Sequence, residues 1–478
     1  MVNVRCLADA VLHLTEGFSE VVGSVSSFEE LEERVQGLVQ RVSLMIMAEV
    51  LEEIDKKLLA ERDQKTLENV GLRKRSIVTS FGELSFRRRL YRETKTQECR
   101  FLLDETLDLG ERKQISPRMS KIMIKLGTEM PFRRASRLLE YIAPGVHAMT
   151  VWSAVQRAGR MVAEEAKASR TAVFKHGEIP LGKKTTRELF IEADGVMIRQ
   201  QRAKACVGEV KLVVGYEGKE GKPRRLVNRH SVAGLTNGEA IWEEASVLFG
   251  SEWALDGIEE VRIGGDGARW IKEGGKAFFP QASYHLDRFH LRKGLTEALS
   301  FCSKCYNEAA EGIATGDREV VLSALEQALK QAPGRPARKR IRQLRKYLLE
   351  NWEGIASLPE NERLGTIEGQ VRHTITRRMK RIGARWTPEG ADRMARLLAV
   401  RANGKLGDYN KAGRNYRQDI FKRIMPPTAI AKSLKAACGE YVDWLAAEVP
   451  ALQGPFAGKP WVKHVLRELT SVRWSLQG

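Results

Sequence analysis

Three acidic residues stand in local settings that suit metal-dependent phosphoryl transfer. Asp194 lies within the apolar run 189–195, Asp266 follows the apolar run 261–265, and Glu368 opens an amphipathic, strongly basic segment. Carboxylate oxygens are preferred ligands of Mg²⁺ and Mn²⁺, and two such ions can stabilise both the attacking and the leaving oxygen of an in-line displacement. The three residues therefore predict a site that holds two Mg²⁺ (or Mn²⁺) ions and acts on phosphodiester bonds.

Each acid also has a simpler interpretation when it is taken alone. Strand alternation places Phe190, Glu192 and Asp194 on one face, where Glu192 is either an auxiliary metal ligand or, as we favour, the ion-pair partner of an arginine. Asp266 stands between two glycines and fits an ordinary turn, while Glu368 fits a solvated helix face. It is the combination of the three acids that favours a metal site.

The elements around these acids follow a recognisable order. Three predicted strands precede a helix, a strand, a second helix and a last strand; the strands span 187–200, 209–217, 224–235, 259–265 and 282–287, and the helices 239–249 and 268–277. This is the order of an RNase H-like sheet, whose first strand is central and has the fourth as a neighbour. We therefore expect an α/β multi-domain protein with an RNase H-like core, a mixed five-stranded sheet with flanking helices, interrupted by an all-α insertion.

The N-terminal part of the chain predicts one long helix and one β-hairpin. Apolar residues recur at helical spacing from 28 to about 60, where we favour internal packing and keep dimerisation as the alternative. The segment 75–92 fits a hairpin with Gly82 and Glu83 as its turn. Its basic second arm either lies along the phosphate backbone of a nucleic acid or is a solvated edge strand whose charges prevent pairing with strands of other molecules.

Two further helices are predicted over 132–159, with a break at 143–145. In a helix-turn-helix, the second helix, which here carries Trp152, enters the major groove of DNA. The connection is longer than is usual for that motif, so an ordinary pair of packed helices is the alternative. The residues alone do not decide between the two.

The chain is strongly basic. Its 478 residues carry a net charge of +19 with a pI of about 9.7, and 42% of them are hydrophobic, enough for three or four globular domains. The commonest partner of so basic a globular protein is nucleic acid. Two segments supply the side chains expected to contact DNA: Arg338, Lys339, Arg340 and Arg342, and then Arg372, Arg377, Arg378, Lys380 and Arg381.

Other function classes lack their sequence signatures. No signal-peptide organisation and no bilayer-spanning apolar run are found, so we expect a cytoplasmic, nucleoid-associated protein that does not bind membrane. Cys302 and Cys305 form one CxxC without a second pair or a nearby histidine, so we expect reduced cysteines and no zinc site. The run 177–183 nearly matches a phosphate-binding loop, but Lys184 stands where Ser or Thr is needed, so we expect no nucleoside triphosphate site.

Two segments resemble bacterial insertion-sequence transposases. The first is Asp287-Arg288-Phe289-His290, which follows Tyr284-His285-Leu286; the second is Glu368-Gly369-Gln370-Val371-Arg372 with the basic run 377–386. In the order, spacing and flanks of these motifs, the chain from about 75 to about 398 is similar to the ISLre group, which is related to Mutator-like elements. The individual motifs are weakly specific, whereas their combination is strongly specific.

This resemblance implies a DDE-type catalytic core. Asp194, Asp266 and Glu368 match its three catalytic and metal-binding acids. Asp287 and His290 match the (C/D)xxH signature after the last core strand, which is interpreted as structural or near the DNA and outside the metal triad.

The resemblance also implies roles for the flanking segments. The helical insertion would contact DNA near the cut, with Trp352 as a base-stacking residue. The unit 132–159, including Trp152, matches the helix-turn-helix region, which makes binding of terminal repeats our preferred interpretation.

We therefore expect a transposase that binds the ends of its insertion sequence and catalyses metal-dependent cleavage and strand transfer on double-stranded DNA, as a homodimer or larger synaptic assembly. The alternatives are an RNase H-like nuclease or resolvase that cuts without joining, and a DNA-binding regulator built on a retired transposase. The expected domains are 1–65 (helical), 66–165 (hairpin and helix-turn-helix), 185–290 with 361–385 (catalytic core), 291–360 (insertion) and 386–478 (helical).

Overall fold

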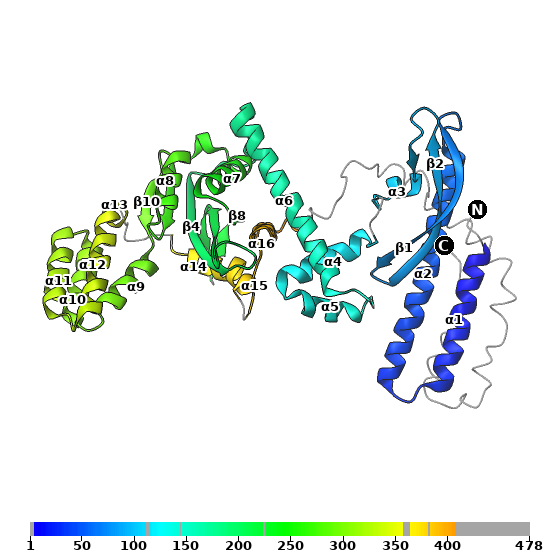
Figure 1. Cartoon of the computed structure of the whole chain (residues 1–478), viewed down its shortest axis with the longest axis horizontal. Helices are drawn as coiled ribbons and strands as arrows, with labels where there is room; N and C mark the ends of the chain where they lie inside the picture. Colours follow the sequence, from blue (N-terminus) through cyan, green and yellow to red (C-terminus); the bar gives the residue numbers. More distant parts are fainter. Residues whose placement is uncertain are drawn as a thin grey trace. The chain divides into compact units, whose positions relative to one another are not determined.

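The computed structural model describes residues 4–110, 114–143, 145–222, 225–356, 364–380 and 383–407. These residues fall into two compact units, and Figure 1 labels most of their helices and some of their strands. The first unit holds the described residues up to Ile122 together with Ser136–Val146, and the second holds Met123–Ala135 and the described residues from His147 onward. The predicted DNA contact Arg381 and most of the predicted region 386–478 lie outside the described residues. No helix in the described ranges is long and apolar enough to cross a bilayer.

The first unit combines helices with a small antiparallel sheet. Its elements include α1 (Val4–Ser24), α2 (Phe28–Glu61), β1 (Leu67–Thr79), β2 (Gly82–Glu93), β3 (Cys99–Arg100) and α3 (Leu102–Thr106). The predicted long helix is confirmed as α2, which begins after Ser27 because the Ser27 hydroxyl accepts a hydrogen bond from Glu30 N at 3.2 Å. Buried side chains of α2, the hairpin and α3 form one core: Ile54, Ile77, Leu84, Phe86 and Leu103.

The hairpin of β1 and β2 turns two residues earlier than predicted. Thr79 pairs with Gly82, so Ser80 and Phe81 form the turn, and the prediction of a turn at Gly82 and Glu83 is wrong. The Thr79 side chain explains this position, since its hydroxyl accepts from Phe81 N at 3.1 Å and donates to Gly82 O at 2.9 Å. Gly82 has a φ of +120°, a conformation that favours glycine at the first residue after the turn.

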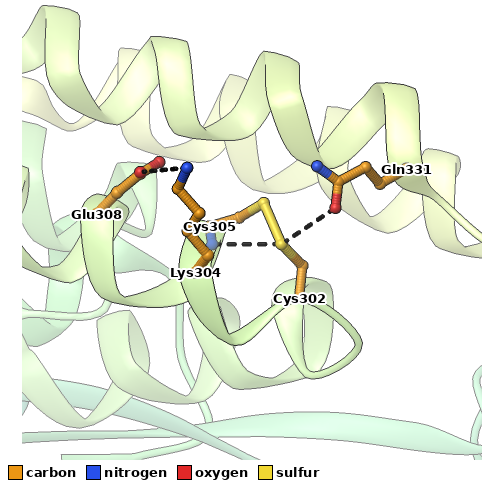
Figure 2. Close-up of a disulfide and its surroundings, with 5 residues drawn as sticks. All are labelled: Cys302, Lys304, Cys305, Glu308 and Gln331. Carbon is orange, nitrogen blue, oxygen red and sulfur yellow. Dashed lines mark hydrogen bonds and ion pairs between the residues drawn. A yellow bond between two sulfur atoms is a disulfide. The ribbon is translucent and has the colours of Figure 1, made fainter.

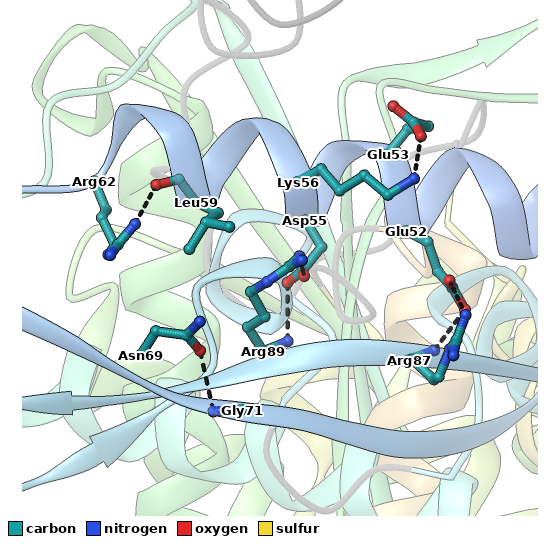
Figure 3. A network of polar contacts seen from close by, with 10 residues as sticks. All are labelled: Glu52, Glu53, Asp55, Lys56, Leu59, Arg62, Asn69, Gly71, Arg87 and Arg89. Carbon is teal, nitrogen blue, oxygen red and sulfur yellow. Dashed lines mark hydrogen bonds and ion pairs between the residues drawn. The ribbon is translucent and has the colours of Figure 1, made fainter. Parts of the chain in front are cut away.

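The basic arm of the hairpin forms ion pairs inside the first unit. β2 lies between β1 and β3, but β3 pairs only with Tyr91 and Arg92, so the rest of the arm lies at an edge of the sheet. Figure 3 shows Arg87 and Arg89 directed at two acids of α2: Arg87 lies 3.2 Å from Glu52, and Arg89 lies 2.5 Å from Asp55. These arginines therefore join the sheet to α2.

A five-stranded mixed sheet forms the centre of the second unit. Its strands are β4 (Glu188–Arg199), β5 (Val207–Tyr216), β8 (His230–Gly234), β9 (Glu260–Gly265) and β10 (Ser283–Leu286), in the spatial order β10-β9-β4-β5-β8. β4 is antiparallel to β5 and parallel to β9; β5 is antiparallel to β8, and β9 is parallel to β10. The predicted mixed five-stranded sheet is confirmed. The third predicted strand is divided, because β7 (Arg225–Val227) pairs with β6 (Gly218–Glu220) instead of joining the sheet.

Helices cover both faces of this sheet. Leu189, Ile191 and Ala193 of β4 are fully buried in the core that also contains side chains of α7 (Gly238–Glu252) and α8 (Arg269–Phe278). The intervening residues of β4 face the other side, which contacts α14 (Ile367–Val371) and α16 (Pro388–Ala402). Strand alternation thus separates an apolar face from the face that carries the acids.

The residues after β10 are helical, as the sequence pattern predicted. Their helices are α9 (Arg288–Leu299), α10 (Ser303–Thr315), α11 (Arg318–Gln331), α12 (Arg335–Glu350) and α13 (Trp352–Ala356). The buried side chains of these helices and the buried side chains on the apolar face of the sheet form one hydrophobic cluster, which includes Leu189 of β4 and Leu348 of α12. The helical segment therefore shares one continuous hydrophobic core with the sheet.

A disulfide joins Cys302 and Cys305 at the start of α10 (Figure 2), so the expectation that these two cysteines are reduced is wrong. Both residues are buried, and Cys302 Sγ accepts a hydrogen bond from Cys305 N at 3.3 Å. Cys302 is the N-cap of α10 and Cys305 lies in its first turn. The helix start brings their Cα atoms to 5.4 Å, a separation that a disulfide spans.

Three further helices lie between α3 and the five-stranded sheet in the chain: α4 (Pro117–Glu129), α5 (Phe132–Glu140) and α6 (Ala148–His176). The helix predicted to run to about 159 continues to 176. Gly159 allows α16 to approach α6, because a Cβ at this position would lie 2.8 Å from Arg393 O. Val155 is buried, whereas Trp152 is 40% exposed near the start of α6.

Candidate metal centre

Asp194 reaches the centre from β4. It follows the last pair between β4 and β9, Glu192 with Gly264, so it lies where these parallel strands separate. Its Oδ1 accepts a hydrogen bond from Gly195 N at 2.7 Å, and the residue is only 6% exposed. No arginine or lysine of the described residues pairs with it. A carboxylate so buried needs another source of positive charge.

Asp266 follows β9 directly and lies in a supported turn. Its Oδ1 accepts a hydrogen bond from Ala268 N at 2.8 Å, so the turn expected for Gly-Asp-Gly is present. α12 supports it from the other side, because Tyr347 Oη donates to Asp266 O at 2.7 Å. Gly267 has a φ of +91°, and a Cβ there would lie 2.9 Å from the Asn351 side chain. The helical segment therefore helps to place this acid.

His290 comes from the first turn of α9. Asp287 N donates to Gly265 O at 2.8 Å, which ties the start of α9 to the end of β9. Asp287 Oδ1 accepts from Phe289 N at 3.2 Å, and Asp287 Oδ2 lies 2.7 Å from His290 Nδ1. One buried carboxylate thus caps the helix and orients the imidazole.

Asp194, Asp266 and His290 converge: one ligand atom from each lies within 4.8 Å of the other two. Two ligands of one cation at about 2.1 Å each are at most about 4.2 Å apart, so a small movement closes the three around a divalent cation. The donor set and its spacing fit such an ion. The resemblance to transposases predicts a place for His290 outside the metal triad, although its position just after a core strand was a usable signal.

Glu368 is not part of this group but lies within electrostatic reach of Asp194. It is the second residue of α14 and is exposed, and its charge contributes to the raised pKa of Asp194. The helix that it opens is irregular: α14 passes into a π-helical segment, η2 (Arg372–Thr376), and then into α15 (Arg377–Met379). The buried stripe repeats every four residues, and the wider π turns keep it on one face: Ile367, Val371, Ile375 and Met379.

Glu192 has a different role from either of those expected for it. It is 2% exposed, and its oxygens accept hydrogen bonds from the backbone N–H groups of Gly365, Thr366 and Ile367 at 2.8 to 3.2 Å. Tyr216 Oη donates to it at 2.6 Å. Among the described residues it forms no ion pair with an arginine, so that expectation is wrong, and it does not belong to the group of Asp194, Asp266 and His290. Glu192 instead holds the start of α14, the helix of Glu368.

The centre is short of positive charge. Burial, followed by the charge of Asp266 and with a smaller contribution from the charge of Glu368, raises the pKa of Asp194 to about 6. The hydrogen bond to Asp287 raises the pKa of His290 above its usual range. Clustered acids that destabilise one another's charge are stabilised by a bound cation.

The predicted DNA-contacting side chains divide between surface and interior. Exposed side chains on α12 and after Glu368 are Arg338, Lys339, Arg340, Arg342, Arg372, Arg377 and Lys380. Arg378 is buried instead: its Nε donates to Gly127 O at 2.9 Å, and its guanidinium lies 4.9 Å from the ring centroid of Phe132 and 5.1 Å from that of Trp386. Trp352 is partly buried and packs against the core beneath the sheet. Arg378 is therefore committed to internal packing, whereas the role of the partly buried Trp352 as a base-stacking residue stays a prediction.

The phosphate-loop-like run contributes to a surface hollow that shares no residue with the acids. The hollow is lined by Gly182, Lys183, Lys184, Thr185, Glu217 and Asn228. Its two lysines are already paired, since Lys183 Nζ lies 3.1 Å from Glu252 and Lys184 Nζ lies 2.9 Å from Asn228 Oδ1.

Comparison with known proteins finds bacterial relatives along most of the chain. The UPF0236 protein TTE0402 of Caldanaerobacter subterraneus subsp. tengcongensis is 27% identical over 404 residues, covering 82% of this chain and 78% of the relative. The UPF0236 protein in vanSb 3'region of Streptococcus gallolyticus is 26% identical over 417 residues, covering 83% and 88%. Residues 23–415 match the model of an uncharacterised protein family, UPF0236. The chain therefore belongs to the uncharacterised family UPF0236.

Proposed function

We propose that the chain is a DDE-type DNA transposase that cleaves and joins strands at the ends of its own insertion sequence with Mg²⁺ or Mn²⁺. The observation that carries this proposal is the meeting of Asp194 and Asp266 where neighbouring parallel strands separate, within electrostatic reach of Glu368. Ligand sites of open α/β sheets characteristically lie at the carboxyl ends of parallel strands.

The sheet topology supports an RNase H-like core. The first strand, β4, is central; its antiparallel partners β5 and β8 follow on one side, and the parallel strands β9 and β10 lie on the other. Glu368 comes from a helix on the acid-bearing face of β4, after a helical segment that occupies the place of the expected insertion.

The chemistry is a pair of phosphoryl transfers. Asp194, Asp266 and Glu368 hold the cations, which when bound supply Lewis-acid activation of the nucleophile and stabilise charge on the phosphate oxygens. A water oxygen attacks phosphorus and the bond to the 3′ oxygen breaks, which leaves a 3′-hydroxyl. That hydroxyl then attacks a target phosphodiester, displaces its 3′ oxygen and joins the strands. The exposed arginines after Glu368 hold the DNA backbone.

The names of the relatives add support. In Caldanaerobacter subterraneus, one relative carries a single name that combines eleven gene designations, from TTE0033 to TTE2212, and another relative carries a name that combines four. A protein encoded at many positions of one genome is what a mobile element would leave behind.

A strand-transfer assay tests the proposal. The full chain is incubated with linear duplex from the borders of its own gene, a supercoiled target plasmid, and Mg²⁺ or Mn²⁺. Wild type should give joined products, and Glu368→Gln should abolish them while DNA binding persists. Glu273→Gln is the matched control, because Glu273 is an exposed acid on α8 that pairs with Arg269.

The other outcomes separate the rival functions. Metal-dependent cleavage that never yields joined strands would replace the transposase with a nuclease or resolvase. Tight binding of the gene borders without any cleavage, unchanged by Glu368→Gln, would indicate a DNA-binding regulator. Analytical ultracentrifugation of the protein bound to DNA carrying the two ends measures the number of chains in the complex. Joining two ends requires a homodimer or a larger assembly.

A further inference from the structure

We propose that His290 is a metal ligand beside Asp194 and Asp266, so that the centre has one nitrogen donor and binds Mn²⁺ more tightly than Mg²⁺. This inference rests on the proposed function, because it assumes that the two aspartates hold a divalent cation. It goes beyond a triad of carboxylates by adding a ligand from α9.

The position of His290 is the first argument. Its ring offers a nitrogen within 4.8 Å of ligand atoms of both aspartates, whereas no atom of Glu368 belongs to that group. α9 starts at the end of β10, the strand next to β9, and the hydrogen bond from Asp287 N to Gly265 O anchors it there. The backbone therefore holds the imidazole over the same edge of the sheet as the acids.

The orientation of the ring is the second argument. Asp287 Oδ2 lies 2.7 Å from His290 Nδ1, and Asp287 is 8% exposed with its other oxygen bound to Phe289 N. A proton on Nδ1 completes this hydrogen bond and leaves the lone pair on Nε2 for a cation. A carboxylate that fixes the tautomer of a metal-binding histidine is the usual second partner of such a ligand.

The charge of the neighbours is the third argument. Asp194 is 6% exposed and has no arginine or lysine partner among the described residues, and Asp266 lies beside it. A cation bound by both carboxylates and the imidazole satisfies all three groups together. Carboxylates suit both Mg²⁺ and Mn²⁺, whereas an imidazole nitrogen is a better ligand for a first-row transition metal than for Mg²⁺, so adding His290 to the two aspartates favours Mn²⁺ over Mg²⁺.

Pulsed electron paramagnetic resonance of the full chain loaded with one equivalent of Mn²⁺ tests the assignment. The wild type should show the ¹⁴N modulation of a coordinated imidazole. His290→Gln should lose that modulation and bind Mn²⁺ at least ~10-fold more weakly, with a smaller loss for Mg²⁺. His176→Gln is the matched control, because His176 is an exposed histidine at the end of α6 and should leave both readouts unchanged.

A second variant protects the test against misfolding. Asp287→Asn keeps the imidazole but weakens its support, so the ¹⁴N modulation should persist while Mn²⁺ affinity falls by ~10-fold. Bound Mn²⁺ without ¹⁴N modulation in the wild type would overturn the role of His290 and leave the proposed function standing. Failure of the wild type to bind Mn²⁺ or Mg²⁺ at all would remove both proposals.

Discussion

Glu192 on β4 accepts the backbone N–H of Thr366, a residue 174 positions later in the chain, at 2.9 Å. The Thr366 hydroxyl and the N–H groups on both sides of it bind the same carboxylate. Thr366 is the N-cap of α14, so a buried charge on the central strand satisfies the free N–H groups at the start of this helix. Two residues further on is Glu368, which makes the Glu192 carboxylate a positioning group for the third acid.

Replacement of Glu192 should therefore loosen the start of α14. Glu192→Ala leaves the N–H groups of Gly365, Thr366 and Ile367 without their acceptor and should lower the free energy of unfolding by about 3 kcal/mol. Glu192→Gln retains one acceptor oxygen and should cost about half as much. Urea denaturation measures the loss, and hydrogen exchange of 365–371 should accelerate in both variants.

Glu188→Gln is the matched control for this prediction. Glu188 lies on the same strand and forms a half-exposed ion pair with Arg262 at 3.4 Å, so its loss should cost less than about 1 kcal/mol. Equal effects of the two glutamine substitutions would show that the contact with Thr366 does not hold the helix.

The burial of Asp194 predicts an unusual dependence of stability on pH. Its pKa is about 6 in the folded chain against an ordinary value of 3.8, so the folded state binds this proton more tightly than the unfolded state does. The metal-free protein should lose stability as pH rises from about 4 to about 6, by up to about 3 kcal/mol from this residue. Asp194→Asn removes the penalty and should be more stable than wild type at neutral pH in chelator, with the difference vanishing near pH 4.

Chemical denaturation at a series of pH values measures that difference. Mn²⁺ should stabilise the wild type and have little effect on Asp194→Asn, because the variant lacks a ligand charge. Asp256→Asn, at an exposed position, should follow the wild-type profile. If Asp194→Asn were no more stable than the wild type at neutral pH, the buried Asp194 carboxylate would not destabilise the metal-free protein, and the prediction would be contradicted.

Arg377 and Arg378 are adjacent, but their replacement by alanine should affect different properties of the protein. Arg377 is exposed, so Arg377→Ala should weaken DNA binding and reduce the salt slope of the binding constant by about one unit, with unfolding unchanged. Arg378 is buried beside Phe132 and Trp386, so Arg378→Ala should lower the free energy of unfolding by about 2 to 3 kcal/mol with the salt slope unchanged. Fluorescence titrations at several salt concentrations, paired with denaturation, separate the two. The same response from both variants would refute the division between surface and interior.

The sheet was predictable because its strands carry strong local signals. The alternation of Leu189, Ile191 and Ala193 with polar neighbours set the faces of β4, and the order of the elements set its partners. The hairpin turn was not predictable from its glycine, because a side-chain hydrogen bond of Thr79 determined the turn position. The disulfide of Cys302 depends on a helix cap, which the spacing alone does not reveal.

The candidate site was predictable in part. Asp194 and Asp266 were expected together because an RNase H-like order makes the first and fourth strands neighbours, and the parallel pairing of β4 with β9 places both acids at one edge. The approach of His290 depends on the direction of α9, which a single backbone hydrogen bond to Gly265 fixes, and no periodic pattern encodes it. The partners of Glu192 are backbone groups distant in sequence, so alternation indicated its face but not what it binds.

A buried charge cluster in the first unit gives the last prediction. Asp104 lies 2.5 Å from Arg75 and 2.8 Å from Arg88, and all three side chains are at most 7% exposed. Asp104→Ala would leave two buried guanidinium groups without their carboxylate, and it should lower the free energy of unfolding by about 3 to 5 kcal/mol. Glu105→Ala is the matched control, because the neighbouring pair with Arg100 is 42% and 36% exposed and should cost less than about 1 kcal/mol. Equal losses in urea denaturation would mean that the carbonyl groups already bound by Arg75 are sufficient to hold the buried cations in place.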